Sequence, residues 1–135
     1  MKHDDPYKEA LRYIDNARET LKLAGKDGKY YEDDKYVRTA SGTAYLGLVK
    51  ALDFYLNVKG VPKKRGRKSI EYYQHEVAKL DKKILNHLNT GYRILHIDGY
   101  YEGEKKIKVI DEGLDSAISI IEAIKQYSNN GVSQK

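Results

Sequence analysis

Apolar residues recur at alternating steps of three and four positions along nearly the whole chain, and this spacing limits its possible folds more than any other feature. Such steps place one side chain per turn on the same face of an α-helix, whereas a half-buried strand needs alternation at every second position. Only Pro6 and Pro62 interrupt the 135 residues, and no alternating run of strand length occurs. The pattern therefore predicts an all-α fold without strands.

Four stripes of apolar residues predict four helical segments, over residues 7–24, 37–58, 70–88 and 107–124. Residues that can cap a helix precede the first three stripes. Glycines follow the helices where the chain must turn. The predicted caps are Asp4 or Asp5 before Pro6, the acidic run 32–34, and Ser69; the predicted stops are Gly25, Gly28, Gly60 and Gly103.

The third segment allows two interpretations. Its stripe continues in register through Tyr92, Leu95 and Gly99, which favours one long helix over residues 69–101. Alternatively, the sequence Asn-Thr-Gly at 89–91 divides it into two nearly collinear helices.

The length fits one domain with a single core, which we expect to span residues 1–135 as an antiparallel up-down bundle of four to five helices. Within it we expect an ordered core over 5–128 and a polar tail over 129–135 that frays. The small residues of "TASGTAYLG" (39–47) predict a close approach between two helix axes.

Several classes of site and location are disfavoured by the sequence. Without cysteine, the chain forms neither disulfides nor thiolate metal sites, and we expect a cytoplasmic protein. The charged start and the short apolar runs match neither a signal peptide nor a membrane span. The four histidines lack the spacing of familiar metal motifs, so we expect no metal and no cofactor.

Positive charge is concentrated in one segment, "KGVPKKRGRK" (59–68), which we call the basic loop. It carries six cations and no acid, and subtracting them from the net charge of +5 leaves −1 for the rest of the chain. Next to tyrosines that could stack on bases, it suits a polyanion such as RNA; the alternative is a solvated connection. The candidate residues are Lys59, Lys63, Lys64, Arg65, Arg67, Lys68 and Tyr72, with Tyr73 beside it.

A second candidate site lies in "YRILHIDGYYEG" (92–103). In an α-helix Arg93, His96 and Tyr100 would share a face, and Asp98 would point away from Arg93. Arginine holds phosphate, histidine transfers protons near neutral pH, and the tyrosine hydroxyl donates or accepts a hydrogen bond. The alternative is a core edge from which Arg93 reaches solvent.

The chain resembles an uncharacterised bacterial domain family of HEPN-like helical bundles. The resemblance is carried by "YVRTASGTAYLGLVKALDFYL" (36–56), "LHIDGYY" (95–101) and "EGLDSAISIIEAI" (112–124), and it covers most of the chain. It implies a helical bundle of four or five helices that is often a homodimer. Wider HEPN members include RNA-cleaving proteins and partners of nucleotidyltransferases.

The resemblance also implies a site pattern. HEPN ribonucleases carry an arginine followed, after four to six residues, by a histidine, usually working across a dimer interface. Arg93 and His96 have two residues between them, and Arg67 and His75 have seven, so both depart from the pattern. Some nucleotidyltransferase-associated members have tyrosine instead of histidine, and Arg93 with Tyr100 matches that spacing best.

We therefore expect a non-enzymatic interaction or binding protein of HEPN-like type that forms a homodimer. One alternative is an RNA-acting or nucleotide-binding protein that uses Arg93, His96 and Tyr100. Another is a polyanion-binding module that uses the basic loop.

Overall fold

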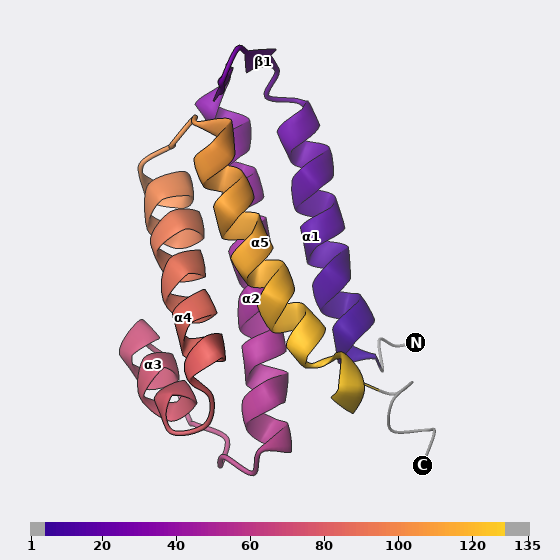
Figure 1. Cartoon of the computed structure of the whole chain (residues 1–135), viewed down its shortest axis with the longest axis vertical. Helices are drawn as coiled ribbons and strands as arrows, with labels where there is room; N and C mark the ends of the chain where they lie inside the picture. The colour runs from indigo at the N-terminus through magenta and orange to yellow at the C-terminus, as the bar shows by residue number, and fades with distance from the viewer. Residues whose placement is uncertain (1–4, 129–135) are drawn as a thin grey trace.

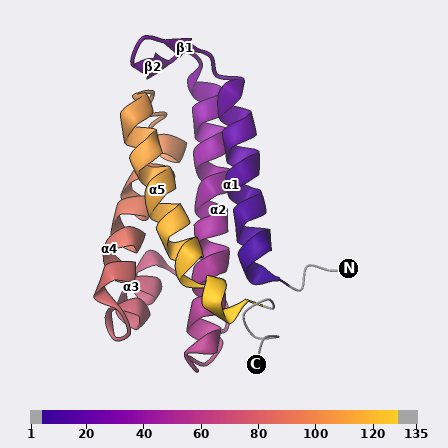
Figure 2. The same cartoon turned by 45° about the vertical axis from the view of Figure 1, so that its right-hand side comes forward.

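The computed structural model describes residues 5–128 and is a helical bundle, which confirms the all-α expectation (Figure 1). The chain runs up in α1, down in α2, up in α4 and its continuation η1, and down in α5 (Figures 1 and 2). A shorter helix, α3, packs beside α4 at the end of the bundle away from a small β-hairpin. The helices are α1 (Pro6–Lys22), α2 (Asp34–Val58), α3 (Ile70–Ala78), α4 (Lys82–Gly91), η1 (Tyr92–Tyr101), α5 (Ile107–Ala123) and η2 (Lys125–Tyr127).

The predicted helix starts are confirmed by side-chain caps. The Asp5 carboxylate accepts hydrogen bonds from the amides of Tyr7 and Lys8 at 3.0 and 3.2 Å, with Pro6 in the first turn. Asp33 caps α2, and Ser69 Oγ accepts the amide of Tyr72. Each cap satisfies an amide that a helix start would otherwise leave without a partner.

The predicted break at 89–91 is wrong, and so is a single helix over 69–101. The chain breaks earlier, between α3 and α4, because the Asp81 carboxylate caps a new helix by accepting the amides of Lys83 and Ile84 at 2.8 and 3.0 Å. Leu80, which the stripe predicts to be buried, is 40% exposed at this turn. At Gly91 the helix continues, since the missing side chain lets Leu48 of α2 pack against it.

A small hairpin corrects the expectation of no strands. β1 (Lys26–Asp27) and β2 (Tyr30–Tyr31) pair antiparallel between α1 and α2. Gly28, at the turn, has φ +63°, a backbone conformation that favours glycine. The Tyr31 amide also donates to the Lys105 carbonyl at 2.8 Å, which ties the hairpin to the start of α5 (Figure 2).

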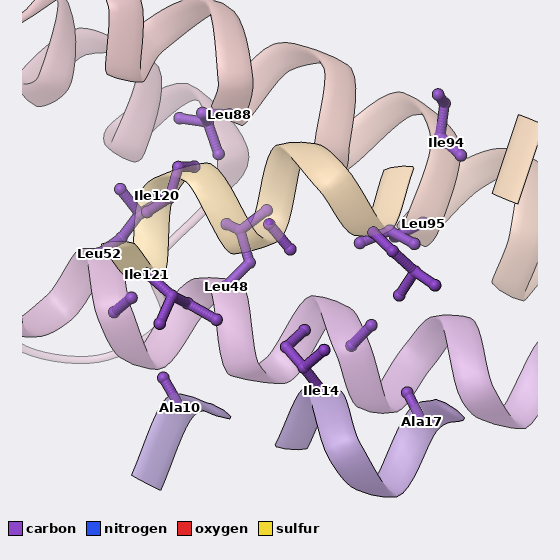
Figure 3. Close-up of a cluster of buried hydrophobic side chains, with 14 of the residues drawn as sticks. Ala10, Ile14, Ala17, Leu48, Leu52, Leu88, Ile94, Leu95, Ile120 and Ile121 are labelled. Atoms are coloured by element: carbon purple, nitrogen blue, oxygen red, sulfur yellow. The ribbon is translucent and has the colours of Figure 1, made fainter. Parts of the chain in front are cut away.

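Small residues on α2 permit the close approach that the sequence predicts. A Cβ at Gly47 would lie 2.8 Å from Tyr13 Cβ and 3.1 Å from the Ala10 carbonyl oxygen, so α1 sits directly against the α2 backbone. The rest of the core consists mainly of alanine, leucine and isoleucine side chains from α1, α2, α4 with η1, and α5 (Figure 3). Across residues 5–128, none of the helices is both long and apolar enough to cross a bilayer.

Candidate functional site

The helix η1 is a π-helix, and its geometry decides which side chains of the second candidate site come together. Its backbone hydrogen bonds join residues about five positions apart, so it turns less per residue than an α-helix. Tyr92, His96 and Tyr100 form a row on one face of η1. The His96 ring centroid lies 5.3 Å from that of Tyr92 and 6.0 Å from that of Tyr100, with interplanar angles of 30° and 13°.

Two further tyrosines complete the surroundings of His96. Tyr45 reaches it from α2, with ring centroids 4.9 Å apart, and Tyr101 meets it edge-on at 5.1 Å. Burial among these rings lowers the pKa of His96 from its ordinary value, because desolvation penalises the charged imidazolium. Burial also raises the pKa of Tyr45 to about 12. The lowered pKa favours the uncharged His96 ring at neutral pH.

Arg93 lies apart from this row. Its Nη1 is 3.9 Å from Asp98 Oδ2, and its side chain is 61% exposed. The expectation that Asp98 points away from Arg93 is therefore wrong, because residues five apart become neighbours in a π-helix. The structure keeps His96 with Tyr100 and pairs Arg93 with Asp98 instead.

Arg38 of α2 holds the end of η1, a role that the sequence analysis missed. Its guanidinium donates to the Tyr101 carbonyl at 2.6 Å and to the Tyr100 carbonyl at 3.4 Å, and its Nε pairs with Asp34 at 2.8 Å. These carbonyls at the helix end need donors. Arg38 thus fixes the rings of η1 against α2, and the spacing of Asp34 and Arg38 is the only local signal for it.

The end of the basic loop is fixed by a polar cluster. Lys68 Nζ lies 3.1 Å from Asp53 Oδ1 on α2, and the Tyr73 hydroxyl donates to the same oxygen at 2.7 Å. Burial, followed by the hydrogen bond to Asp53, raises the pKa of Tyr73. Asp53 therefore positions both the loop and α3 on α2.

These elements enclose a cleft of about 490 Å³, which we call the ring cleft. It brings the end of the basic loop to the aromatic face of η1, so the two candidate sites that the sequence separates meet in one place. Val49 and Ile70 supply apolar wall and Glu71 an acid. The polar and aromatic lining comes from Tyr45, Arg67, Lys68, Tyr73, Tyr92 and His96.

The other predicted residues lie outside the ring cleft. Lys59, the first residue of the basic loop, lies with its Nζ 5.7 and 5.4 Å from the ring centroids of Tyr55 and Tyr127. Arg65 is exposed, and neither it nor Arg93 is part of the cleft wall. Lys63, Lys64 and Tyr72 line a neighbouring cleft.

The ring cleft combines groups that can contact phosphate with groups that can stack on an aromatic ring. A guanidinium can hold phosphate with paired hydrogen bonds, and tyrosine and neutral histidine rings can stack on an aromatic ligand. In the described part of the chain, no three His, Cys, Asp or Glu side chains gather closely enough to hold a metal ion.

Comparison with known proteins places the chain in a family without assigning it an activity. The family model described as "Domain of unknown function (DUF5618)" matches residues 5–126. A solved structure described as a protein of unknown function from Dyadobacter fermentans is similar, with a TM-score of 0.80 and 34% identity over 90% of this chain and 94% of that one. Among curated proteins, none matches the chain significantly.

Proposed function

We propose that this chain, which belongs to the DUF5618 family, is a binding protein that holds a nucleotide unit in the ring cleft. The observation that carries the proposal is the meeting of Arg67 from the basic loop with the tyrosine and histidine rings of α2, α3 and η1. A ligand that suits both Arg67 and the rings has a phosphate for the guanidinium and a flat base for the rings. Nucleotides and the units of RNA share that chemistry.

The charges of the cleft favour Arg67 as the phosphate contact. Lys68 is already paired with Asp53 at 3.1 Å, which offsets its charge. No ion pair with Arg67 occurs within residues 5–128, and the side chain is exposed. An arginine held by no acid pairs with phosphate without first breaking another contact.

Binding is favoured over catalysis by the arrangement of Arg93 and His96. His96 faces the ring cleft, whereas Arg93 pairs with Asp98 outside it. A HEPN-type ribonuclease site needs both side chains on one scissile phosphate. The HEPN resemblance remains a prediction, and RNA cleavage that is lost in the Arg93→Ala/His96→Ala double variant would support it. Cleavage that persists in this variant would exclude the site.

The test of the proposal is the binding of a fluorescein-labelled single-stranded RNA, followed by anisotropy at several salt concentrations. Arg67→Gln removes the free cation of the ring cleft, and we expect it to weaken binding about tenfold, as the loss of a charge-assisted hydrogen bond implies. Arg65→Gln is the matched control, because it removes the same charge two residues away, outside the cleft. Equal losses in both variants would show diffuse attraction to the basic loop and overturn the proposal.

A second candidate function is self-association, which an exposed apolar patch favours. Leu46, Tyr100 and Tyr101 are 55%, 45% and 58% exposed. The Tyr100 ring packs over Gly42, one turn of α2 from Leu46, so these side chains share one surface. Patches of this kind commonly mark protein contacts. We infer a second copy of the chain as the partner, with a nucleotidyltransferase as the alternative suggested by the HEPN resemblance.

Light scattering tests self-association. The wild type is expected to be a dimer and Leu46→Glu a monomer, since a buried carboxylate would oppose the contact. Leu23→Glu is the control, because Leu23 is 65% exposed at the C-terminal end of α1 and is not part of the patch. A wild-type monomer at micromolar concentration would remove this candidate.

A further inference from the structure

The basic loop has a second cleft on the other side of Lys68. This loop cleft has a volume of about 310 Å³. It lies between the loop and the end of α2, and Lys68 lines both clefts. Its cationic and aromatic lining consists of Phe54, Lys63, Lys64, Lys68 and Tyr72, and Asp53 and Asn57 also line it.

The two clefts have the same combination of groups. Tyr72 and Tyr73 are consecutive in α3, yet Tyr72 lines the loop cleft and Tyr73 the ring cleft. Their ring centroids are 5.5 Å apart with an interplanar angle of 68°, so the clefts are adjacent. Lys64 Nζ lies 5.9 Å from the Tyr72 ring centroid, so the loop cleft holds a cation next to a ring. The ring cleft likewise is lined by a cation, Arg67, and by the rings of η1.

We propose that the ligand is a single strand of nucleic acid that occupies both clefts at once, with its backbone passing Lys68. This inference rests on the proposed function and narrows its ligand class. A mononucleotide fills one cleft only, whereas a strand links two weak sites and gains affinity from the linkage. Ring platforms need unpaired bases, which a double helix keeps stacked inside itself.

If the ligand is a strand that spans both clefts, its affinity should depend on the number of nucleotides. Uridine monophosphate should bind weakly, in the ring cleft alone. Labelled oligouridylates should bind more tightly as their length grows from one to about four nucleotides, because the second cleft then adds its own contacts. Further length should add only the small statistical gain of having more places to bind.

Three variants distinguish the contributions of the two clefts. Lys64→Gln removes a cation from the loop cleft, and we expect it to weaken an octamer about fivefold and leave uridine monophosphate unchanged. Arg67→Gln should weaken both ligands. Tyr72→Leu, which keeps an apolar side chain in the loop cleft, should reproduce the effect of Lys64→Gln if stacking contributes. Arg65→Gln again serves as the control for charge.

The outcomes distinguish the two proposals. If the mononucleotide binds as tightly as the octamer and Lys64→Gln changes neither, the strand is overturned while nucleotide binding in the ring cleft stands. If neither ligand binds, the proposed function itself fails. A duplex that competes as well as the single strand also overturns the inference. If a deoxyribose octamer binds with the same dependence on Lys64, the strand inference is supported and recognition is through phosphate and base. If only the ribose octamer binds, the strand inference is supported and the protein also distinguishes the sugar.

Discussion

Lys68 and Asp53 join the end of the basic loop to the last turns of α2, with Lys68 Nζ 3.1 Å from Asp53 Oδ1. The same carboxylate oxygen accepts the Tyr73 hydroxyl at 2.7 Å. Lys68 lines both clefts, Asp53 lines the loop cleft, and Tyr73 lines the ring cleft. One carboxylate therefore positions the boundary between the two clefts.

The first prediction concerns this cluster. Asp53→Ala should lower the free energy of unfolding by about 1–2 kcal/mol, because the Tyr73 hydroxyl is left without its acceptor. Tyr73→Phe should lower the free energy of unfolding by about 1 kcal/mol. Lys68→Gln should lower it less, since the ion pair is partly exposed. Urea denaturation measures all three. The Asp53→Ala/Tyr73→Phe double variant should lose less than the sum of the single losses, and strict additivity would contradict the shared contact.

A second prediction follows from the buried His96. Its pKa is lowered, so the unfolded chain binds a proton more readily than the folded one. The resulting stability is complete above the ordinary histidine pKa of 6.5 and is lost as the pH falls below it. Denaturation between pH 7 and about pH 5 should show this loss, and His96→Phe, which keeps a ring in place, should reduce it.

The control for this prediction is His75→Gln, because His75 is exposed on α3. The loss of stability in acid that arises from His96 should be retained in this variant. A His96→Phe variant that loses as much stability as the wild type in acid would show that desolvation of His96 is not the cause.

A third prediction concerns alkaline pH. Tyr45 has its pKa raised from 10.0 to about 12 by burial, so the unfolded chain releases the proton first. The associated stability is present below pH 10 and is lost at about 1.4 kcal/mol per pH unit until the folded group ionises. Tyr45→Phe should make the decline above pH 10, up to about pH 12, shallower by up to this amount. Urea denaturation across this range measures it, and an unchanged slope would contradict the burial of Tyr45.

The fourth prediction concerns the contact between η1 and α2. A side chain at Gly99 would overlap the Ser41 hydroxyl, so Gly99→Ala should destabilise the fold by about 1–3 kcal/mol. The Gly99→Ala/Ser41→Gly double variant should recover part of the lost stability, because removal of the Ser41 side chain makes room for the new methyl group. Ser41 Oγ is buried without a hydrogen-bond partner within the described residues. Ser41→Ala alone should therefore be neutral or slightly stabilising, and a large loss would contradict this account.

Local chemistry made the helix starts predictable. Asp5, Asp33 and Ser69 each stand directly before an apolar stripe, and each satisfies amides of its own helix. The break at Asp81 obeys the same rule, but the apolar pattern continues across it and conceals it. At Gly91 the sequence resembles a stop, but the backbone is helical there, and the missing side chain leaves room for Leu48 of α2.

The site was only partly predictable because it depends on tertiary contacts. The π-helix η1 packs on Ser41 through Gly99 and is held by Arg38, and neither contact is visible in a local pattern. It is this helix that turns Arg93 toward Asp98 and away from His96. The sequence predicts Arg67 and His96 as candidates for two separate sites, but only the packing of α3 on α2 and α4 shows that they share a cleft.

The central claim is that a nucleotide base sits among the rings of the ring cleft. Photocrosslinking of a 4-thiouridine-labelled octamer, followed by mass spectrometry of the peptides, tests it most directly. We predict crosslinks at Tyr73, Tyr92 or His96, reduced in Arg67→Gln and retained in Arg65→Gln. Crosslinks confined to the exposed patch around Leu46 and Tyr100, or to the region of Lys59, would contradict it.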